Sequence, residues 1–234
     1  MGVIWQKDCP VKILLIPGMD GTGELFKPLL DELPNNVDTQ VVCLNSLKTQ
    51  TPKEQASEIA SLIGNDEVII LSESYSGYIA YHLSLLSNVN IKHIVFAASF
   101  LENPTWLSRF NNLLPLNLVR SGLIPDIILS STLFAQRNNK ELVKLFISSL
   151  ELISNSILRQ RLKVITNLVR PTELLSVPCT YVQASNDYLV SKKSVDVFKK
   201  LCININIVKV RGGHFIVQSN PHYFSKLLQG VIAI

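Results

Sequence analysis

The sequence predicts a three-layer α/β domain, with about six mainly parallel strands between two layers of helices and a helical insertion. Short runs rich in β-branched residues alternate with amphipathic segments of helical length. The runs are apolar throughout, which is typical of parallel strands covered on both faces. Hydrophobic types make up 47% of the 234 residues and charged types only 17%, and this composition argues against a disordered chain.

Six runs have the length and composition of strands. They cover residues 11–16, 40–44, 67–71, 91–97, 179–184 and 205–210. Segments with helical periodicity lie between them at 24–33, 52–63, 75–87 and 191–201, and residues 224–231 form a last helix. Repeated strand–helix–strand units with right-handed crossovers place such strands in one parallel sheet.

The alternation of strands and helices stops between residues 103 and 171. This stretch contains no convincing strand, and its helical patterns are interrupted by Pro115 and Pro125. A segment of this length inside an alternating fold indicates an insertion. We therefore expect residues 1–102 and 172–234 to form the core. Residues 103–171, which are rich in Leu, Ile and Phe and include Trp106, would form a helical cap.

The N-terminus, the charge and the cysteines narrow the class of protein. No basic segment followed by an apolar stretch is present at the N-terminus, so no signal peptide is expected. The longest uncharged run, residues 74–91, contains four serines, two asparagines and a histidine and is a poor membrane span. A net charge of +4 is too small to indicate a nucleic-acid partner. The cysteines lack C-x-x-C spacing, so we expect each of them to be a buried free thiol: Cys9, Cys43, Cys179 and Cys202. Free thiols are typical of a reducing compartment, so we expect the protein to be cytoplasmic.

The segment after the third expected strand reads SESYSG at residues 72–77 and leads into a helix. So tight a reversal strains its central residue and needs small residues two positions to either side. Ser72 and Ser76 are small, so Ser74 would present its hydroxyl at a helix N-terminus, where free N–H groups favour a developing anion. The competing interpretation is a serine-rich N-cap. For Glu73, a solvent-exposed or local role is favoured over one in tuning the site.

An acid and a histidine follow two later strands. Asp187 comes after the strand at 179–184, and His214 follows the last strand in the sequence RGGHF. The carboxyl ends of parallel strands meet at one edge of a sheet, and the glycines permit a turn that aims the imidazole over it. The order Ser74, Asp187, His214 is that of a hydrolase triad, with Glu102 as the alternative acid. The other histidines lie within or at the start of expected elements and are interpreted as structural: His82, His93 and His222.

A glycine-rich loop, PGMDGTG at residues 17–23, follows the first expected strand. Such a turn lets backbone N–H groups point into a site, and we assign the N–H groups of Met19 and Tyr75 to an oxyanion hole. The interpretation as a phosphate-binding loop fails because no G-K-[ST] follows, and the G-x-G-x-x-G dinucleotide fingerprint is absent. Asp20 is expected to bond the backbone of its own loop.

Together these four segments resemble the α/β-hydrolase superfamily over about residues 1–101 and 172–234. The loop at residues 17–23, with Phe26 and Pro28 after it, resembles small esterase- or thioesterase-like members. Many relatives have His-Gly where Pro17 and Gly18 stand here, and glycines where this elbow has serines. The first expected strand already precedes the oxyanion loop, so the two leading strands of larger relatives are expected to be mostly absent.

The resemblance implies acyl transfer to water by a serine hydrolase. Ser74 would attack the carbonyl, His214 would remove its proton, Asp187 would hold the imidazole, and the N–H groups of Met19 and Tyr75 would stabilise the oxyanion. The expected substrate is a small-molecule carboxylic ester or thioester with a hydrophobic acyl group bound under the cap. No cofactor and no metal is expected. An acyltransferase, a C–C bond hydrolase and a catalytically silent ligand-binding homologue are the alternatives.

The net charge is unevenly distributed along the chain. Residues 103–171 contain nine Lys or Arg, including Arg161 and Arg170, and three acids, a net charge of +6, and the rest of the chain carries −2. Arg137, Lys140 and Lys144 recur at helical spacing, and a solvated helix face is the favoured interpretation. The alternative is a cap that meets an anionic substrate, such as a CoA ester, or an anionic membrane surface.

Overall fold

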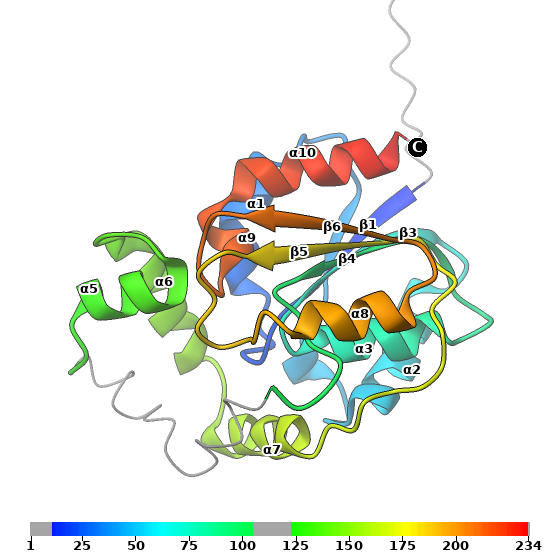
Figure 1. Ribbon diagram of the computed structural model, residues 1–234, viewed down its shortest axis with the longest axis horizontal. Helices are drawn as coiled ribbons and strands as arrows, with labels where there is room; N and C mark the ends of the chain where they lie inside the picture. The colour runs from blue at the N-terminus through cyan, green and yellow to red at the C-terminus, as the bar shows by residue number, and fades with distance from the viewer. Residues whose placement is uncertain (1–10, 105–122, 234) are drawn as a thin grey trace, which may run out of the picture.

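The structure, a computed structural model, describes residues 11–104 and 123–233. A central sheet carries helices on both faces, and a further group of helices stands at one end of the sheet (Figure 1). Within the described ranges, no helix has both the length and the apolar character needed to cross a membrane. The expectations for Cys9 and Trp106 lie outside the described residues.

The sheet contains six parallel strands in the order β2-β1-β3-β4-β5-β6. They are β1 (Val11–Ile16), β2 (Thr39–Val41), β3 (Glu67–Glu73), β4 (Asn90–Ala97), β5 (Cys179–Ala184) and β6 (Ile205–Val210). The predicted parallel sheet is confirmed. Because β2 and β3 lie on opposite sides of β1, the loops that follow β1 and β3 diverge, and a crevice forms at this point of parallel sheets.

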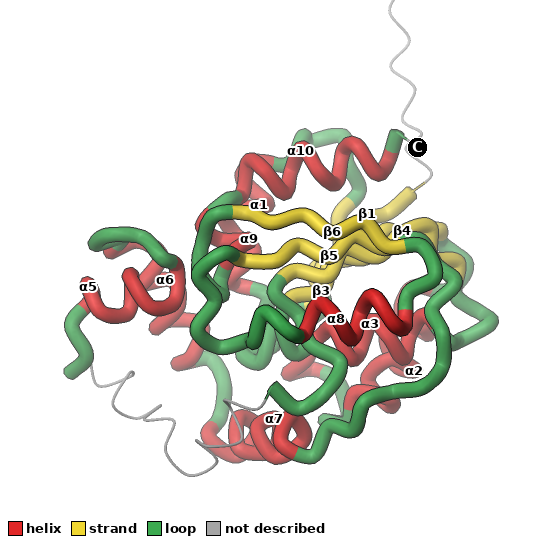
Figure 2. The backbone as a smooth tube through the Cα atoms, in the orientation of Figure 1, coloured by secondary structure: helices red, strands yellow, loops and turns green. Residues whose placement is uncertain are grey.

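Helices cover both faces of the sheet in two layers (Figure 2). One layer contains α2 (Pro52–Ile63), α3 (Ser76–Ser84) and α8 (Ser194–Leu201), and the other contains α1 (Lys27–Glu32), α9 (Ile216–Ser219) and α10 (Pro221–Ile232). Alternate strand residues enter opposite cores: in β1, Leu14 and Ile16 belong to the core under the first layer, and Ile13 and Leu15 to the core under the second. Both faces are buried, which explains why the strand runs are apolar throughout.

The described part of residues 103–171 contains helices and no strand. It forms α5 (Asp126–Leu129), the π-helical turn η4 (Ser130–Phe134), α6 (Lys140–Glu151) and α7 (Asn155–Thr166). The first three share a small hydrophobic core built around Phe134 and Val143, and α5 and α6 stand beyond the carboxyl ends of the strands (Figure 1). Helix α7 differs, because its Leu162 and Ile165 belong to the main core that includes α2 and α3.

Some expected features differ from the observed ones. The second strand, expected at 40–44, ends at Val41 because the chain turns into the short helix η2 (Leu44–Ser46). The helix expected over 75–87 ends at Ser84 because the following residues close tighter turns. Burial is confirmed for the free thiols of Cys179 and Cys202, but it is wrong for Cys43, which is free and exposed at the end of the short edge strand.

Candidate active site

A strained turn joins β3 to α3 and carries Ser74 at its apex. Ser74 has a φ of +55°, a left-handed conformation that residues other than glycine rarely adopt. Its N–H donates to the carbonyl of Ala97 at 3.0 Å, and its own carbonyl accepts from the N–H of Gly77 at 3.1 Å. A strained residue that its surroundings hold in place points to a functional site.

The serines that replace the usual glycines of such a turn have room here. The buried hydroxyl of Ser76 donates to the carbonyl of Ile16 at 2.7 Å and accepts from the N–H of Glu73 at 2.9 Å. Ser76 therefore links the ends of β1 and β3, which glycine could not do. Close packing requires glycine at the next position, Gly77, because a Cβ there would lie 2.6 Å from the Cβ of Ser99.

The structure brings Ser74, His214 and Asp187 together in one hydrogen-bonded chain. Nε2 of His214 lies 2.8 Å from Oγ of Ser74, and Nδ1 lies 2.9 Å from Oδ2 of Asp187. The other carboxylate oxygen, Oδ1 of Asp187, accepts from the N–H groups of Leu189 and Val190 at 2.7 and 2.8 Å. The backbone thus fixes the carboxylate, and the carboxylate fixes the imidazole.

The charges around His214 set its pKa. Burial lowers the pKa of His214, but the charge and hydrogen bond of Asp187, together with the charge of Glu73, raise it by more. The net result is a pKa of His214 above its ordinary value. A raised pKa makes the imidazole a stronger base, provided that the solution pH keeps it neutral before the reaction.

The loop that carries His214 is hydrogen-bonded to the turn η4. The N–H of Gly213 donates to the carbonyl of Phe134, and the N–H of Phe215 donates to the carbonyl of Leu133, both at 3.1 Å. A side chain at Gly213 would overlap the carbonyl of Leu133. Rings of the α5–η4–α6 group also contact this loop: the centroids of Phe134 and Phe146 lie 5.4 and 5.1 Å from that of Phe215.

The competing candidates have other contacts. Glu102 pairs with Arg170 at 2.7 Å, so it is Asp187 and not Glu102 that reaches His214. His93 contacts the Thr180 hydroxyl. The remaining two histidines also lie in local contacts, with His82 against Tyr78 and Tyr81 and His222 on Glu32. Among the residues that the structure describes, no group of three or more His, Cys, Asp or Glu side chains could hold a metal ion.

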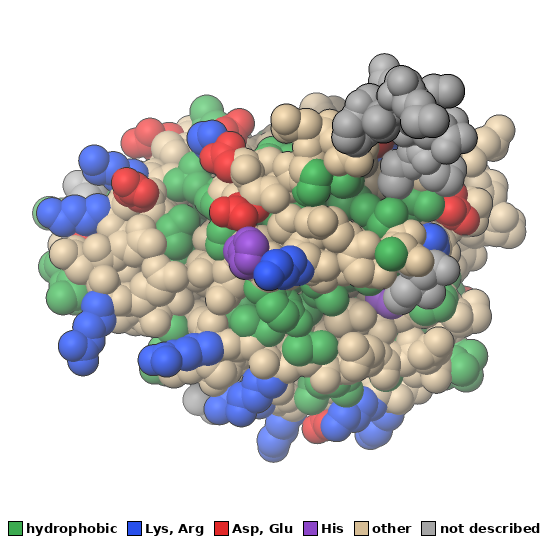
Figure 3. Space-filling model, turned by 90° about the horizontal axis from the view of Figure 1, so that it is seen from above, with side chains coloured by type: hydrophobic (Ala, Val, Ile, Leu, Met, Phe, Trp, Pro, Cys, Tyr) green, Lys and Arg blue, Asp and Glu red, His purple; other side chains and the backbone are tan. Residues whose placement is uncertain are grey.

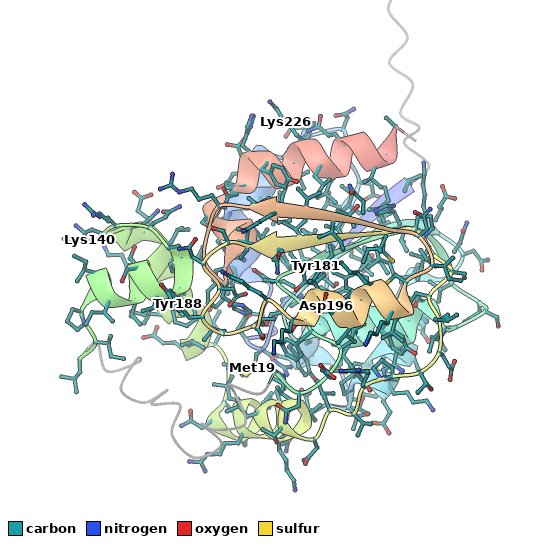
Figure 4. The ribbon with its side chains drawn as sticks, in the orientation of Figure 1. Met19, Lys140, Tyr181, Tyr188, Asp196 and Lys226 are labelled. Carbon is teal, nitrogen blue, oxygen red and sulfur yellow. The ribbon has the colours of Figure 1, made fainter. Side chains whose placement is uncertain are left out.

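The loop after β1 lies against Ser74. Its residues 18–21 form a turn closed by the N–H of Gly21, which donates to the carbonyl of Gly18 at 3.1 Å. A Cβ on Gly18 would be 3.7 Å from the Cβ of Ser74. Within the described ranges, neither the N–H of Met19 nor that of Tyr75 has a hydrogen-bond acceptor, so both are available to stabilise negative charge. Figure 4 shows Met19 between the carboxyl ends of the strands and α7.

Arg161, which the sequence places among the positive charges of residues 103–171, contacts this loop through its side chain. That side chain is completely buried. Nη1 donates to the carbonyl of Met19 at 2.8 Å, and Nε donates to Oε1 of Gln50 at 3.1 Å. The sequence does contain a signal for this burial, because Arg161 lies on the apolar face of α7 together with Leu158 and Leu162.

Glu73, expected at the surface or in a local pair, is instead buried beside the triad. Its Oε2 accepts from Nε2 of Gln218 at 3.0 Å, and its Oε1 has no hydrogen-bond partner among the described residues. Burial, together with the charge of Asp20, raises the pKa of Glu73 to about 7, although the Gln218 hydrogen bond and the charge of His214 lower it. Glu73 and His214 therefore influence each other's ionisation.

Replacing Glu73 with glutamine is expected to shift the acid limb of the kcat/KM profile to lower pH. Glutamine keeps the shape and the contact with Gln218 but removes the negative charge that stabilises the protonated form of His214. The pKa of His214 then falls, so the imidazole stays neutral in more acidic solution. The charge of Asp187 remains in both proteins, so the measured difference reports on Glu73. Superimposable profiles would contradict the role of its charge.

An apolar cavity of about 140 Å³ opens beside Ser74 and His214. The core supplies Leu25 and Phe100, and the described part of residues 103–171 supplies most of the remaining apolar wall: Leu129, Leu133, Phe146, Leu150 and Ile165. Asp20, whose carboxylate accepts from the N–H and hydroxyl of Thr22 as expected of a turn residue, also lines the cavity, as does Glu73. The cavity can therefore receive an apolar group attached to an atom that lies next to Ser74.

The outward positive charge of residues 103–171 is smaller than the sequence implies. Figure 3 shows Lys and Arg side chains at the end of the molecule formed by α5 and α6. Lys140 and Lys144 are exposed on α6, but Arg137 lies in the loop before it, so the expected helical row of three is wrong. Arg161 is buried, and Arg170 is paired with an acid.

Comparison with known proteins identifies the fold. No protein-family model matches this sequence, and no curated protein matches it. Among solved structures, an esterase (EaEST) from Exiguobacterium antarcticum is similar with a TM-score of 0.77 and 13% identity, over 95% of this chain and 92% of that one. An alpha/beta hydrolase fold protein from Chitinophaga pinensis has a TM-score of 0.74 and 15% identity, over 94% and 88%.

A thioesterase, RedJ, from the prodiginine biosynthetic pathway in Streptomyces coelicolor has a TM-score of 0.68 and 16% identity, over 96% of this chain and 91% of that one. These structural similarities span nearly the whole chain. At such low sequence identity they show the fold alone. The chain has the α/β-hydrolase fold, as its sequence motifs predicted.

Proposed function

We propose that this protein is a serine hydrolase that cleaves a carboxylic ester or thioester with a hydrophobic acyl group. The observation that carries the proposal is the chain of hydrogen bonds from Asp187 through His214 to Ser74, which ends beside an apolar cavity. A nucleophile, a base and a group that orients the base are the components that acyl transfer requires.

In the proposed mechanism, Oγ of Ser74 attacks the carbonyl carbon while Nε2 of His214 takes its proton. The N–H groups of Met19 and Tyr75 stabilise the oxyanion, and Asp187 stabilises the imidazolium. The intermediate then expels an alcohol or thiol, which receives the proton from His214, and leaves an acyl group on Ser74. Water attacks this acyl-enzyme with His214 again as base, and the carboxylic acid is released.

We propose that residues 103–171 act as a cap that supplies the acyl-binding wall. Residues of α5, η4, α6 and α7 line the cavity beside Ser74. A volume of about 140 Å³ is close to that of an engineered protein cavity that binds benzene, so the pocket fits an acyl group of about six carbon atoms. A similar fold serves an esterase and a thioesterase among the compared structures, so both leaving groups are included in the proposal.

A fluorophosphonate probe and a substrate panel test the proposal. The wild-type protein is expected to label at a single serine, and the Ser74→Ala variant is expected not to label. A wild-type protein that binds apolar esters but never labels would be a ligand-binding protein instead. Matched oxygen and sulfur esters of increasing acyl length, assayed with and without an acceptor alcohol, then separate an esterase, a thioesterase and an acyltransferase.

The same panel tests the acyl pocket through Phe146. Replacing Phe146 with alanine removes a ring from the cavity wall, so the acyl length with the highest kcat/KM is expected to increase by several carbons. Leu145→Ala is the matched control, because Leu145 is the adjacent residue on α6, is half-buried and does not line the cavity. Equal length preferences in the wild type and the Phe146→Ala variant would show that the acyl group binds elsewhere.

A further inference from the structure

We infer that Arg161 is a positioning residue for the oxyanion hole: its buried guanidinium fixes the peptide that follows Met19, so that the turn keeps the N–H of Met19 aimed at the reacting carbonyl. This inference rests on the proposed function. It gives α7, which lies in the proposed cap, a part in the chemistry and not only in substrate binding.

The surroundings of Arg161 are unusual for a buried cation. The side chain is completely buried, no carboxylate of the described residues forms an ion pair with it, and its Nη2 has no hydrogen-bond partner among them. A charge removed from water without a paired opposite charge destabilises the folded state. Its presence next to a candidate site therefore suggests a functional reason for keeping it.

The guanidinium of Arg161 completes a set of hydrogen bonds to the backbone carbonyls of the loop after β1. Three consecutive carbonyls of the loop are each held by a different donor: Gly18 by the N–H of Gly21 at 3.1 Å, Met19 by Nη1 of Arg161 at 2.8 Å, and Asp20 by Nδ2 of Asn45 at 3.2 Å. The Met19 N–H lies in the same planar peptide as the Gly18 carbonyl, so the bond from Gly21 fixes that plane. Arg161 fixes the next plane, between Met19 and Asp20, and so limits rotation of the backbone at Met19, on which the direction of its N–H depends.

The loop is shaped to receive the guanidinium. Gly21 has a φ of +67°, and a Cβ at this position would overlap Nη1 of Arg161. Glycine therefore serves two purposes here, since it permits the turn and leaves room for the arginine. On the other side, Gln50 accepts from Nε of Arg161 at 3.1 Å and keeps the planar group in one orientation. Donors held in place before the reaction need no reorganisation when the oxyanion forms.

The test is the Arg161→Met variant, with Arg159→Met as the matched control. Arg159 lies two residues earlier on the same helix and is exposed. For Arg161→Met we expect kcat to fall by about 10- to 100-fold, less than the ~10²- to 10³-fold loss on removing an oxyanion-hole donor outright. KM is expected to stay within about threefold, because ground-state binding is not affected. The affinity for an alkyl boronic acid, which forms a tetrahedral adduct with the serine, is expected to fall in parallel with kcat/KM.

Thermal unfolding separates positioning from a structural role. A buried charge replaced by an apolar residue of similar volume often leaves stability unchanged or increases it, so the Tm of Arg161→Met is expected to equal or exceed that of the wild type. If this variant does not fold, Arg161→Lys is assayed in its place. A folded variant with kcat and boronate affinity within twofold of wild type would overturn the inference, and so would failure of both variants to fold.

Assays of the wild-type protein distinguish a failure of this inference from a failure of the proposed function. If the wild type neither hydrolyses the ester panel nor labels with the fluorophosphonate, the proposed function fails. If the wild type labels at Ser74 and the Arg161→Met variant reacts equally fast, only the role of Arg161 fails.

Discussion

Replacing Ser74 with alanine is expected to lower kcat by about 10⁶-fold, the scale of nucleophile removal in serine hydrolases. The hydroxyl of Ser74 lies 2.8 Å from Nε2 of His214, and without it the proposed acyl-enzyme cannot form. Residual turnover would come from water activated beside the proposed oxyanion hole, which the substitution leaves intact. The measurement is kcat for the best ester of the panel, with thermal unfolding to show that the variant is folded.

A neighbouring serine provides the control for this variant. Ser72 is also buried, and its hydroxyl makes only a long contact, 3.5 Å, to the carbonyl of Val95. Ser72→Ala is therefore expected to keep kcat within a few-fold of wild type. Full activity in Ser74→Ala, or an equal loss in both variants, would refute Ser74 as the nucleophile.

Replacing Asp187 with asparagine is expected to lower kcat by up to about 10⁴-fold. The reason lies in the backbone donors around this side chain. The N–H groups of Leu189 and Val190 require an acceptor at the position of Oδ1, so the amide oxygen must take that position. The amide nitrogen then faces Nδ1 of His214, which has to accept a hydrogen bond and carries its proton on Nε2, toward Ser74. In this tautomer the imidazole cannot take the proton of the nucleophile.

The pH dependence of kcat and a second variant test this explanation. Loss of the Asp187 charge also lowers the pKa of His214, because this carboxylate helps to raise it. The acid limb is therefore expected at lower pH in Asp187→Asn than in the wild type. Glu102→Gln, which changes the alternative acid, is expected to stay within about twofold of wild type, because Glu102 contacts Arg170. A large loss in Glu102→Gln with little loss in Asp187→Asn would reverse the assignment.

The sequence predicts the fold well where apolar runs end at clear turn signals. Strands β1, β5 and β6 have the expected bounds, and the helix at Pro52–Ile63 begins at its proline and ends before a glycine as expected. The end of the short strand β2 was predicted three residues too late. Val42 and Leu44 are apolar and buried like strand residues, although the chain already turns into η2 there.

The arrangement of the candidate site is partly contained in the strand order. Ser74, Asp187 and His214 each follow a parallel strand, and such strands end at the same edge of the sheet. The burial of Glu73 was not predicted and the role of Arg161 was not recognised, because a charged residue is expected at the surface unless a partner is visible in the sequence. Their partners, Gln218 and Met19, lie 145 and 142 residues away, and only the folded chain brings them together.

The hydrogen bonds between η4 and the loop of His214 couple the position of η4 to that of the proposed base. Any hinged opening that separates η4 from the core must break the bonds from Gly213 and Phe215, and the proposed base sits between these two residues. A displacement of η4 would therefore loosen the loop that holds the proposed base. Substitutions in η4 are expected to affect the reactivity of His214 as well as the shape of the cavity, because Leu133 lines that cavity.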